Sequence, residues 1–171
     1  MDNLHKNVSH LNFLKDLPKT GSGTKSGNML RQYWHPLCLS EDLKDIPYGV
    51  RMLGEDLVAF RCGDGGLGLV GQFCPHRCTS LEYGQIKLSG LKCSYHGWTF
   101  DRRGNCIDMP LEPVNSPLRN EIKHIWYPVE EWSGVVWCYM GMDKANPPPL
   151  PKIDILGRSD GKMVLSRGDI R

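Results

Sequence analysis

The sequence predicts an all-β fold, a small antiparallel sandwich or barrel preceded by an N-terminal arm. Short runs rich in Val, Leu, Phe and Trp recur from Tyr48 onwards, and Gly-containing turns separate them. No run of twelve residues within 48–141 has apolar side chains at helical spacing. Many short strands at such intervals are typical of antiparallel β-sandwiches and barrels.

The first predicted strands form two successive hairpins. The run at 50–53 turns at Gly-Glu-Asp into 57–62, and the tight turn at 63–66 leads into 67–73. The remaining strands are expected at 85–94, as a pair around Ser89 and Gly90, at 98–101 and 106–109, and at 124–132 and 135–141. Pro110, Pro113 and Pro117 indicate a loop between the last two hairpins.

Three parts are predicted along the chain: an arm at 1–27, a domain at 28–145, and a proline-rich linker at 146–171 that begins a further, catalytic domain with a strand near 163–171. The Gly/Ser/Thr-rich residues 20–27 are expected to be loop. Residues 28–36 are expected to form a short helix or an extended segment. In that segment the side chains expected to anchor the arm on the core are Leu30, Tyr33 and Trp34.

Composition excludes several classes of protein. The net charge is +2 and the basic residues are dispersed, so we expect no nucleic-acid partner. No run approaches 18 apolar residues, and the first ten residues lack the apolar core of a secretory signal, so we expect neither a membrane span nor export. Seven cysteines in a cytoplasmic, reducing compartment favour metal binding over a disulfide framework.

The strongest chemical signal is a repeated pairing of cysteine with histidine. Cys74-Pro-His76 is followed, after 16 residues, by Cys93-Ser-Tyr-His96. In a Rieske [2Fe–2S] centre one iron takes two cysteines and the other takes two histidines, which is this inventory. Pro75 and Gly97 let the backbone bend around sulfur, where amide N–H groups can donate to it. A zinc site made from Cys74, Cys78, Cys93 and His96 is the competing interpretation, but it leaves His76 without a role.

Two stretches carry a resemblance to a known family. CPHRCTSLEYGQ (74–85) and CSYHGWTFDRRGNC (93–106) closely resemble the cluster loops of the α subunits of Rieske non-haem iron oxygenases. GTKSGNMLRQYWHPLCLSEDL (23–43) resembles the lead-in of the phthalate dioxygenase-like subgroup. The resemblance covers about residues 28–150. It implies a Rieske domain of stacked antiparallel sheets with the cluster at one tip. By that resemblance the buried iron is bound by Cys74 and Cys93, and the outer iron by His76 and His96.

The chain departs from related patterns in two ways. Respiratory-type Rieske proteins carry a further cysteine in each loop, joined by a disulfide, whereas Cys78 has no counterpart in the second loop and is expected at a position often taken by glycine. Oxygenase α subunits also hold a mononuclear iron between two histidines and a carboxylate. No remaining pair of histidines has a His-x4-His spacing beside an acid, so that site is expected only in a domain beyond this chain, and no catalytic residue is predicted here. The remaining histidines are His5, His10, His35 and His124.

The resemblance implies an electron-transfer domain of an oxidoreductase that hydroxylates or demethylates aromatic compounds. A flavin or iron–sulfur reductase, or a ferredoxin, would reduce the [2Fe–2S] cluster. The electron would then pass to mononuclear Fe(II) in the catalytic domain of the same or a neighbouring subunit of a trimer-based homo-oligomer. The alternative is a stand-alone Rieske ferredoxin-type carrier, which the arm and the proline-rich exit disfavour. A zinc-stabilised binding module is a third hypothesis.

Several other side chains have predicted roles. Tyr95 and Trp98 flank His96 and either shield the cluster or simply pack. Arg77 is expected to be exposed near the tip, where a redox partner would meet it, and His124 is expected at the surface. Small buried core residues are expected at Cys38, Cys62, Cys106 and Cys138, and core or interface aromatics at Trp126, Trp132 and Trp137.

Overall fold

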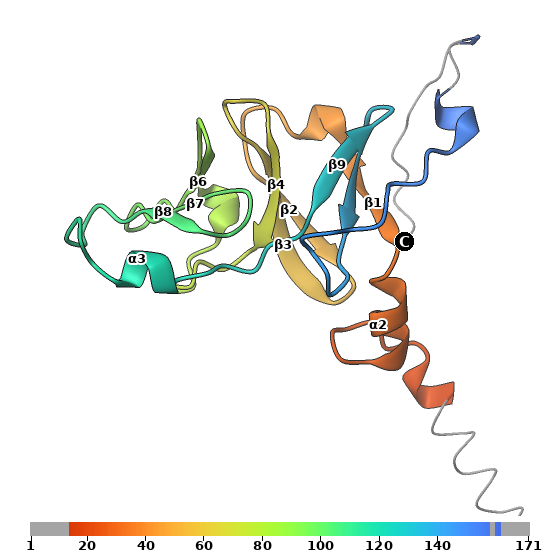
Figure 1. Cartoon of the computed structure of the whole chain (residues 1–171), viewed down its shortest axis with the longest axis horizontal. Helices are drawn as coiled ribbons and strands as arrows, with labels where there is room; N and C mark the ends of the chain where they lie inside the picture. Colours follow the sequence, from red (N-terminus) through yellow and green to blue (C-terminus); the bar gives the residue numbers. More distant parts are fainter. Residues whose placement is uncertain (1–13, 158–159, 162–171) are drawn as a thin grey trace, which may run out of the picture.

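Three antiparallel sheets make up the protein in a computed structural model, which describes residues 14–157 and 160–161 (Figure 1). The arm before residue 14, with His5 and His10, and the strand predicted near 163–171 lie outside the described residues. The first sheet has the order β1 (Trp34–Leu39), β10 (Val135–Tyr139), β9 (Val129–Trp132). The second has the order β2 (Tyr48–Met52), β3 (Glu55–Arg61), β4 (Leu67–Gly71).

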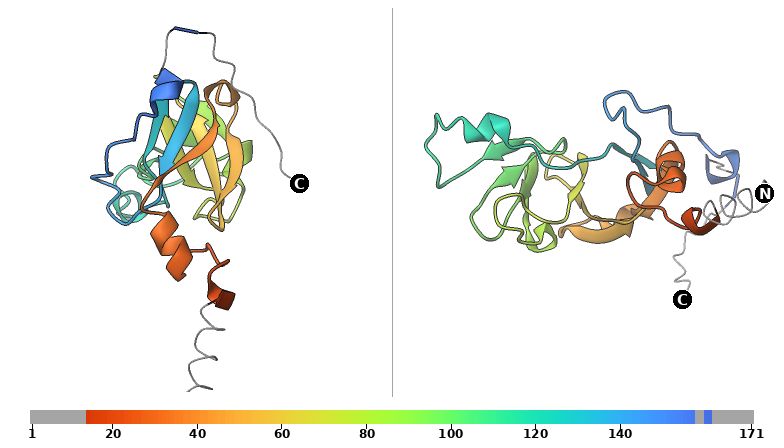
Figure 2. Two further views of the ribbon diagram at one scale, coloured as in Figure 1. Left: turned by 90° about the vertical axis from the view of Figure 1, so that its right-hand side faces the viewer. Right: turned by 90° about the horizontal axis from the view of Figure 1, so that it is seen from below.

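The third sheet, called here the distal sheet, consists of β5 (Gln85–Lys87), β6 (Gly90–Lys92), β7 (Thr99–Phe100) and β8 (Cys106–Asp108) in that order. Helix α2 (Lys25–Leu30) precedes the first sheet, and the short helix α3 (Leu118–Glu121) follows the distal sheet. Short 3-10 turns lie at Ser40–Asp42, Leu81–Tyr83 and Asp154–Gly157. Figure 2 shows the distal sheet at one end of the molecule and α2 at the other. The predicted all-β class and its hairpins are confirmed.

Strand β3 separates two cores because both of its faces are buried. Val58 and Phe60 pack into the core beneath the distal sheet, whereas Leu57 and Ala59 pack into the core between the first and second sheets. All four side chains are at most 1% exposed. A strand buried on both faces reads as a continuous apolar run, which explains the sequence LVAF. Strand β3 therefore contributes side chains to both cores and lies between them.

Strand β10, the central strand of the first sheet, is also buried on both faces. Val136 and Cys138 face the core shared with the second sheet, while Trp137 and Tyr139 pack with Trp34 on the outer face. The proline-rich segment lies across that outer face, where the carbonyl of Pro148 accepts a hydrogen bond of 2.7 Å from Trp34 Nε1. The segment is thus held to the sheet by an indole donor.

The secondary structure of residues 20–27 differs from the prediction. Residues 20–27 were expected to be loop, yet α2 begins at Lys25 because the hydroxyl of Thr24 accepts the backbone N–H of Gly27 at 3.1 Å. Residues 28–36 contain both predicted states: α2 ends at Leu30 and β1 starts at Trp34, then continues to Leu39 against β10.

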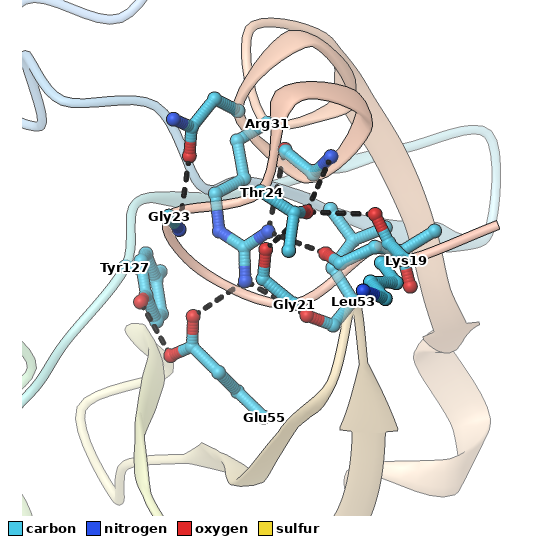
Figure 3. Close-up of polar contacts among 11 residues, drawn as sticks. Lys19, Gly21, Gly23, Thr24, Arg31, Leu53, Glu55 and Tyr127 are labelled. Atoms are coloured by element: carbon cyan, nitrogen blue, oxygen red, sulfur yellow. Dashed lines mark hydrogen bonds and ion pairs between the residues drawn. The ribbon is translucent and has the colours of Figure 1, made fainter. Parts of the chain in front are cut away.

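Arg31 anchors the arm, a role that the sequence assigned to Leu30, Tyr33 and Trp34. Its guanidinium donates to the carbonyls of Thr20 and Leu53 and to the carboxylate of Glu55, which also accepts a hydrogen bond from Tyr127 (Figure 3). Trp34 is buried as expected, but Tyr33 is 63% exposed, so its predicted anchoring role is wrong.

His124 is buried, so its predicted surface position is wrong. The side chain is 8% exposed and Nε2 lies 2.8 Å from the carbonyl oxygen of Gly71. The backbone N–H of His124 donates to Gly104 at 2.7 Å. His124 thus joins the end of β4 to the turn between β7 and β8.

The predicted strand at 124–132 is shorter than expected. It begins only at Val129, directly after Pro128, which has no N–H to donate.

Candidate metal centre

Two loops meet at one end of the distal sheet. The first loop, residues 74–79, lies between β4 and β5, and the second loop, residues 93–98, joins β6 to β7. Because β5 and β6 are antiparallel, with Gln85 opposite Lys92, the start of β5 and the end of β6 lie at the same end. The sheet topology therefore brings the two predicted cluster loops together.

Both loops close with the same backbone hydrogen bonds. The cysteine N–H donates to the carbonyl five residues later, at 2.9 Å for Cys74 to Thr79 and 2.8 Å for Cys93 to Trp98. The N–H four residues after each cysteine donates back to the cysteine carbonyl, at 2.9 Å from Cys78 and 3.2 Å from Gly97. The loops are therefore structural equivalents although their histidines stand at different positions.

The fourth residue after each cysteine has a left-handed backbone, with φ of 52° at Cys78 and 76° at Gly97. Glycine adopts this conformation most readily, which gives a physical reason for the expectation that Cys78 fills a glycine-type position. The Cys78 side chain is exposed. It therefore does not join the buried thiols of Cys74 and Cys93.

The thiols of Cys74 and Cys93 are buried and interact with each other. Cys74 is 1% exposed and Cys93 is 4% exposed. Burial, followed by the neighbouring Cys93, raises the pKa of the Cys74 thiol to about 12, while the backbone N–H groups of His76 and Arg77 donate to its sulfur and act in the opposite direction. Paired thiolates in such a site require a bound cation to offset their charge.

The imidazoles of His76 and His96 lie beside each other and nearer to solvent than the two thiols. The ring centroids of His76 and His96 are 4.6 Å apart, with an angle of 60° between the planes. Both side chains are half-buried. The pKa of His96 is lowered by burial first, then by the charges of His76 and Arg77, so the neutral imidazole that binds metal is favoured. Arg77 is exposed beside them, as predicted.

The donor set fits a cluster of two irons. Each loop contributes one buried sulfur and one half-buried imidazole, so the sulfurs form one pair and the imidazoles another. Within residues 14–157 and 160–161, no group of three or more His, Cys, Asp or Glu side chains converges to hold a single metal ion. A mononuclear zinc site from Cys74, Cys78, Cys93 and His96 would have to bring the exposed Cys78 side chain to the two buried thiols, whereas each iron of a Rieske centre needs only two side chains.

The four remaining cysteines are buried free thiols in the cores, as predicted. Burial raises the pKa of Cys38 and Cys138 to about 12 and that of Cys62 to about 11, so these thiols are protonated and inert at neutral pH.

A groove of about 780 Å³ lies away from the two loops. Its lining includes Ser89 and Arg102, from the turns at the opposite end of the distal sheet, and Tyr127 and Lys144. No residue of 74–79 or 93–98 lines it. This groove is therefore separate from the candidate centre, which lies between the two loops.

Comparison with known proteins identifies the domain. The family model of the Rieske [2Fe-2S] domain matches residues 33–120, which include both loops. The chain belongs to this family. A Rieske domain binds a [2Fe–2S] cluster, so the predicted cofactor is confirmed at the level of the domain. No helix in the described part of the Rieske chain is long and apolar enough to cross a membrane.

Several relatives of this Rieske domain are oxygenase subunits. The α subunit of phenoxybenzoate dioxygenase from Ectopseudomonas oleovorans is 46% identical over 82% of this chain, and the oxygenase subunit of phthalate 4,5-dioxygenase from Pseudomonas putida is 44% identical over 73%. The matches span 34% and 29% of those two proteins, so the chain corresponds to about a third of their length. The resemblance to Rieske oxygenase α subunits is confirmed.

A solved structure of the reduced complex between oxygenase and ferredoxin in carbazole 1,9a-dioxygenase has the same fold over 70% of this chain. Its TM-score is 0.61 and its identity 32%, and the match covers 31% of the solved chain. The stacked antiparallel sheets predicted for the Rieske domain are confirmed by this likeness and by the three sheets described above.

Proposed function

We propose that this chain is the electron-transfer domain of a Rieske oxygenase that acts on aromatic compounds, and that Cys74 and Cys93 bind one iron of its cluster while His76 and His96 bind the other. The observation that carries the assignment is the meeting of two equivalent loops, each with one buried sulfur and one accessible imidazole. When bound, the cluster supplies a one-electron carrier whose potential exceeds that of all-cysteine ferredoxins.

The proposed ligands differ in burial, and their roles differ accordingly. Cys74 and Cys93 lie in the core, where burial keeps water from the inner side, and backbone N–H groups of His76 and Arg77 are directed at the sulfur of Cys74. His76 and His96 are half-buried at the tip, where a redox partner can approach them. Exposed Arg77 adds a positive charge beside that approach and suits an acidic partner surface.

The proposed partners follow from the relatives. The complex of oxygenase with ferredoxin in carbazole 1,9a-dioxygenase supports a ferredoxin as the electron donor. A flavin or iron–sulfur reductase is the other proposed donor. The proposed acceptor is a mononuclear iron site, of the kind that oxygenase subunits hold between two histidines and a carboxylate, in the same or a neighbouring subunit of a trimer-based assembly. That none of the seven cysteines forms a disulfide supports the cytoplasmic location that we propose.

The test is iron and sulfide content after anaerobic reconstitution of the full chain. We expect two irons and two sulfides per chain with a red-brown visible spectrum, and complete loss of both in Cys74→Ser and Cys93→Ser. Cys62→Ser and Cys78→Ser, which replace a core thiol and an exposed thiol, serve as matched controls and are expected to keep the cluster. A colourless protein that takes up one zinc per chain, or full cluster content in Cys74→Ser, contradicts the proposal.

A further inference from the structure

Four aromatic rings follow one another through the candidate centre. The ring of Trp98 stacks on His76 with 4.6 Å between centroids and only 8° between planes. His76 lies 4.6 Å from His96, and His96 lies 3.7 Å from Tyr95 with 40° between planes. Each imidazole therefore has one further aromatic ring beside it, in addition to the other imidazole.

The row runs from the core to the surface. Trp98 is 7% exposed and packs in the same core as Cys74 and Cys93. Tyr95, at the other end, is 58% exposed. The imidazole of His76 is thus in contact with a buried ring, and that of His96 with a ring that is mostly exposed.

The second loop supplies three of the four rings. His76 alone comes from the first loop, and its ring contacts both Trp98 and His96 of the second. Trp98 is itself fixed, because its carbonyl accepts the N–H of Cys93 and the strand β7 follows directly. The stack therefore joins the two loops at the position of their imidazoles.

An imidazole ligand needs such support. The torsion that turns a histidine ring about its Cβ–Cγ bond has broad preferences, so packing has to set the ring plane. Ligand side chains that are held by neighbouring residues keep the geometry that a metal centre requires. A nearly parallel indole face restricts rotation of the His76 ring more strongly than the tilted, exposed phenol restricts that of His96.

We propose that Trp98 and Tyr95 are positioning residues for the two imidazole ligands, Trp98 for His76 and Tyr95 for His96. This inference rests on the proposed function. Neither side chain needs to touch iron, since each acts through the plane of the imidazole beside it. Trp98 is the stronger of the two because it is buried and parallel to its partner.

The test compares variants that keep or remove the ring. Trp98→Leu removes the stacked face and Trp98→Phe retains one, while Tyr95→Ala and Tyr95→Phe form the same pair at the exposed end. The readouts are the two imidazole ¹⁴N hyperfine couplings of the dithionite-reduced protein, measured by pulsed electron paramagnetic resonance, and the midpoint potential. Trp132→Leu, a partly buried indole on the outer face of the first sheet, is the matched control.

We expect Trp98→Leu to change one ¹⁴N coupling and to shift the midpoint potential. Tyr95→Ala is expected to change the other coupling by a smaller amount. Both Phe variants and Trp132→Leu are expected to match the wild type. Wild-type couplings and potential in Trp98→Leu overturn the inference. If that variant does not fold, wild-type couplings in Tyr95→Ala, whose altered side chain is mostly exposed, overturn it equally. A wild-type protein without two imidazole couplings refutes the proposed function itself, whereas wild-type couplings that no substitution changes refute only the positioning role.

Discussion

Arg31 forms a buried ion pair with Glu55: Nη2 of the arginine lies 2.7 Å from Oε1 of the glutamate. Only 7% of the Arg31 side chain and 20% of the Glu55 side chain are exposed. The same guanidinium donates to the carbonyls of Thr20 and Leu53, so one side chain joins the arm before α2 to the turn between β2 and β3 (Figure 3). The arm is therefore joined to the second sheet at Thr20.

Replacing Arg31 by Ala is expected to destabilise the protein by about 3 kcal/mol, since breaking a buried pair leaves the other charge without compensation. Two carbonyl acceptors lose their donor in the same step. The midpoint of urea unfolding, followed by circular dichroism, measures the loss. Arg51→Ala is the control, because its ion pair with Asp56 is exposed and is expected to contribute less than about 1 kcal/mol. Equal effects of the two substitutions contradict this ranking.

Tyr127→Phe tests the other contact of Glu55. The phenol donates to Oε2 of Glu55 at 2.6 Å, and burial together with this bond raises the pKa of Tyr127. Loss of the donor alone is expected to cost about 1–2 kcal/mol, less than the loss of Arg31, because the arginine still compensates the carboxylate. In a double-mutant cycle with Arg31→Ala we expect a non-additive result, since both residues bind one carboxylate. Strict additivity would be inconsistent with a shared network.

His124 is expected to make stability fall in mild acid. Burial lowers the pKa of the His124 imidazole below its usual value of 6.5, while its hydrogen bond with Gly71 partly opposes the shift. The unfolded chain therefore binds a proton at higher pH than the folded chain. The stability contribution is complete above about pH 6.5 and decreases as the pH falls from there through the lower folded pKa.

The measurement is the urea midpoint of the wild type and of His124→Gln between pH 7.5 and 5.5. The glutamine amide can donate to the Gly71 carbonyl but does not titrate, so we expect the variant to lose less stability on acidification than the wild type. His35→Gln is a matched control, because His35 also lies 2.8 Å from a backbone carbonyl but is less buried. Identical slopes for the wild type and His124→Gln would refute the assignment to His124.

The equivalent left-handed positions, Cys78 and Gly97, are expected to respond oppositely to substitution. Gly97→Ala costs about 1–2 kcal/mol from φ alone, and its new Cβ would meet Lys92 Cε and Pro110 Cγ, each at 3.1 Å. Cys78→Gly relieves the same backbone strain and is expected to stabilise the protein by about 0.5–1 kcal/mol after the extra entropy of glycine is counted. Thermal unfolding gives both values. Cys78→Ala, which keeps a Cβ, should leave stability and iron content unchanged, and a fall in its iron content would instead make Cys78 a ligand.

The strands were predictable from sequence because each one shows as a local pattern of apolar residues bounded by turn residues. Strand β3 shows its two buried faces as a continuous apolar run, and the tight turns before Glu55 and Leu67 show as Gly-containing segments. The two loops were also visible, since each places its cysteine and histidine within four residues. Helix α2 was hidden, because Gly, Ser and Thr are typical of loops and only the cap by Thr24 reveals its start.

Contacts between distant segments could not be predicted. The partner of His124 is a carbonyl 53 residues earlier, and nothing in its own neighbourhood distinguishes it from a surface histidine. The stacking of Trp98 on His76 likewise crosses from one loop to the other. Both depend on the register of β5 with β6 and of β4 with the segment around Trp126, which the alternation of apolar residues does not specify.

Exchange of one imidazole for a thiolate tests the proposed ligands most directly. Each of His76→Cys and His96→Cys is expected to lower the midpoint potential by on the order of 100 mV, because a thiolate adds negative charge that a neutral imidazole lacks. His35→Cys, which changes a histidine on β1, is expected to leave the potential at its wild-type value. The measurement is a redox titration followed by visible circular dichroism on samples of equal iron content. An unchanged potential in a fully loaded His76→Cys or His96→Cys protein would show that the substituted imidazole is not a ligand.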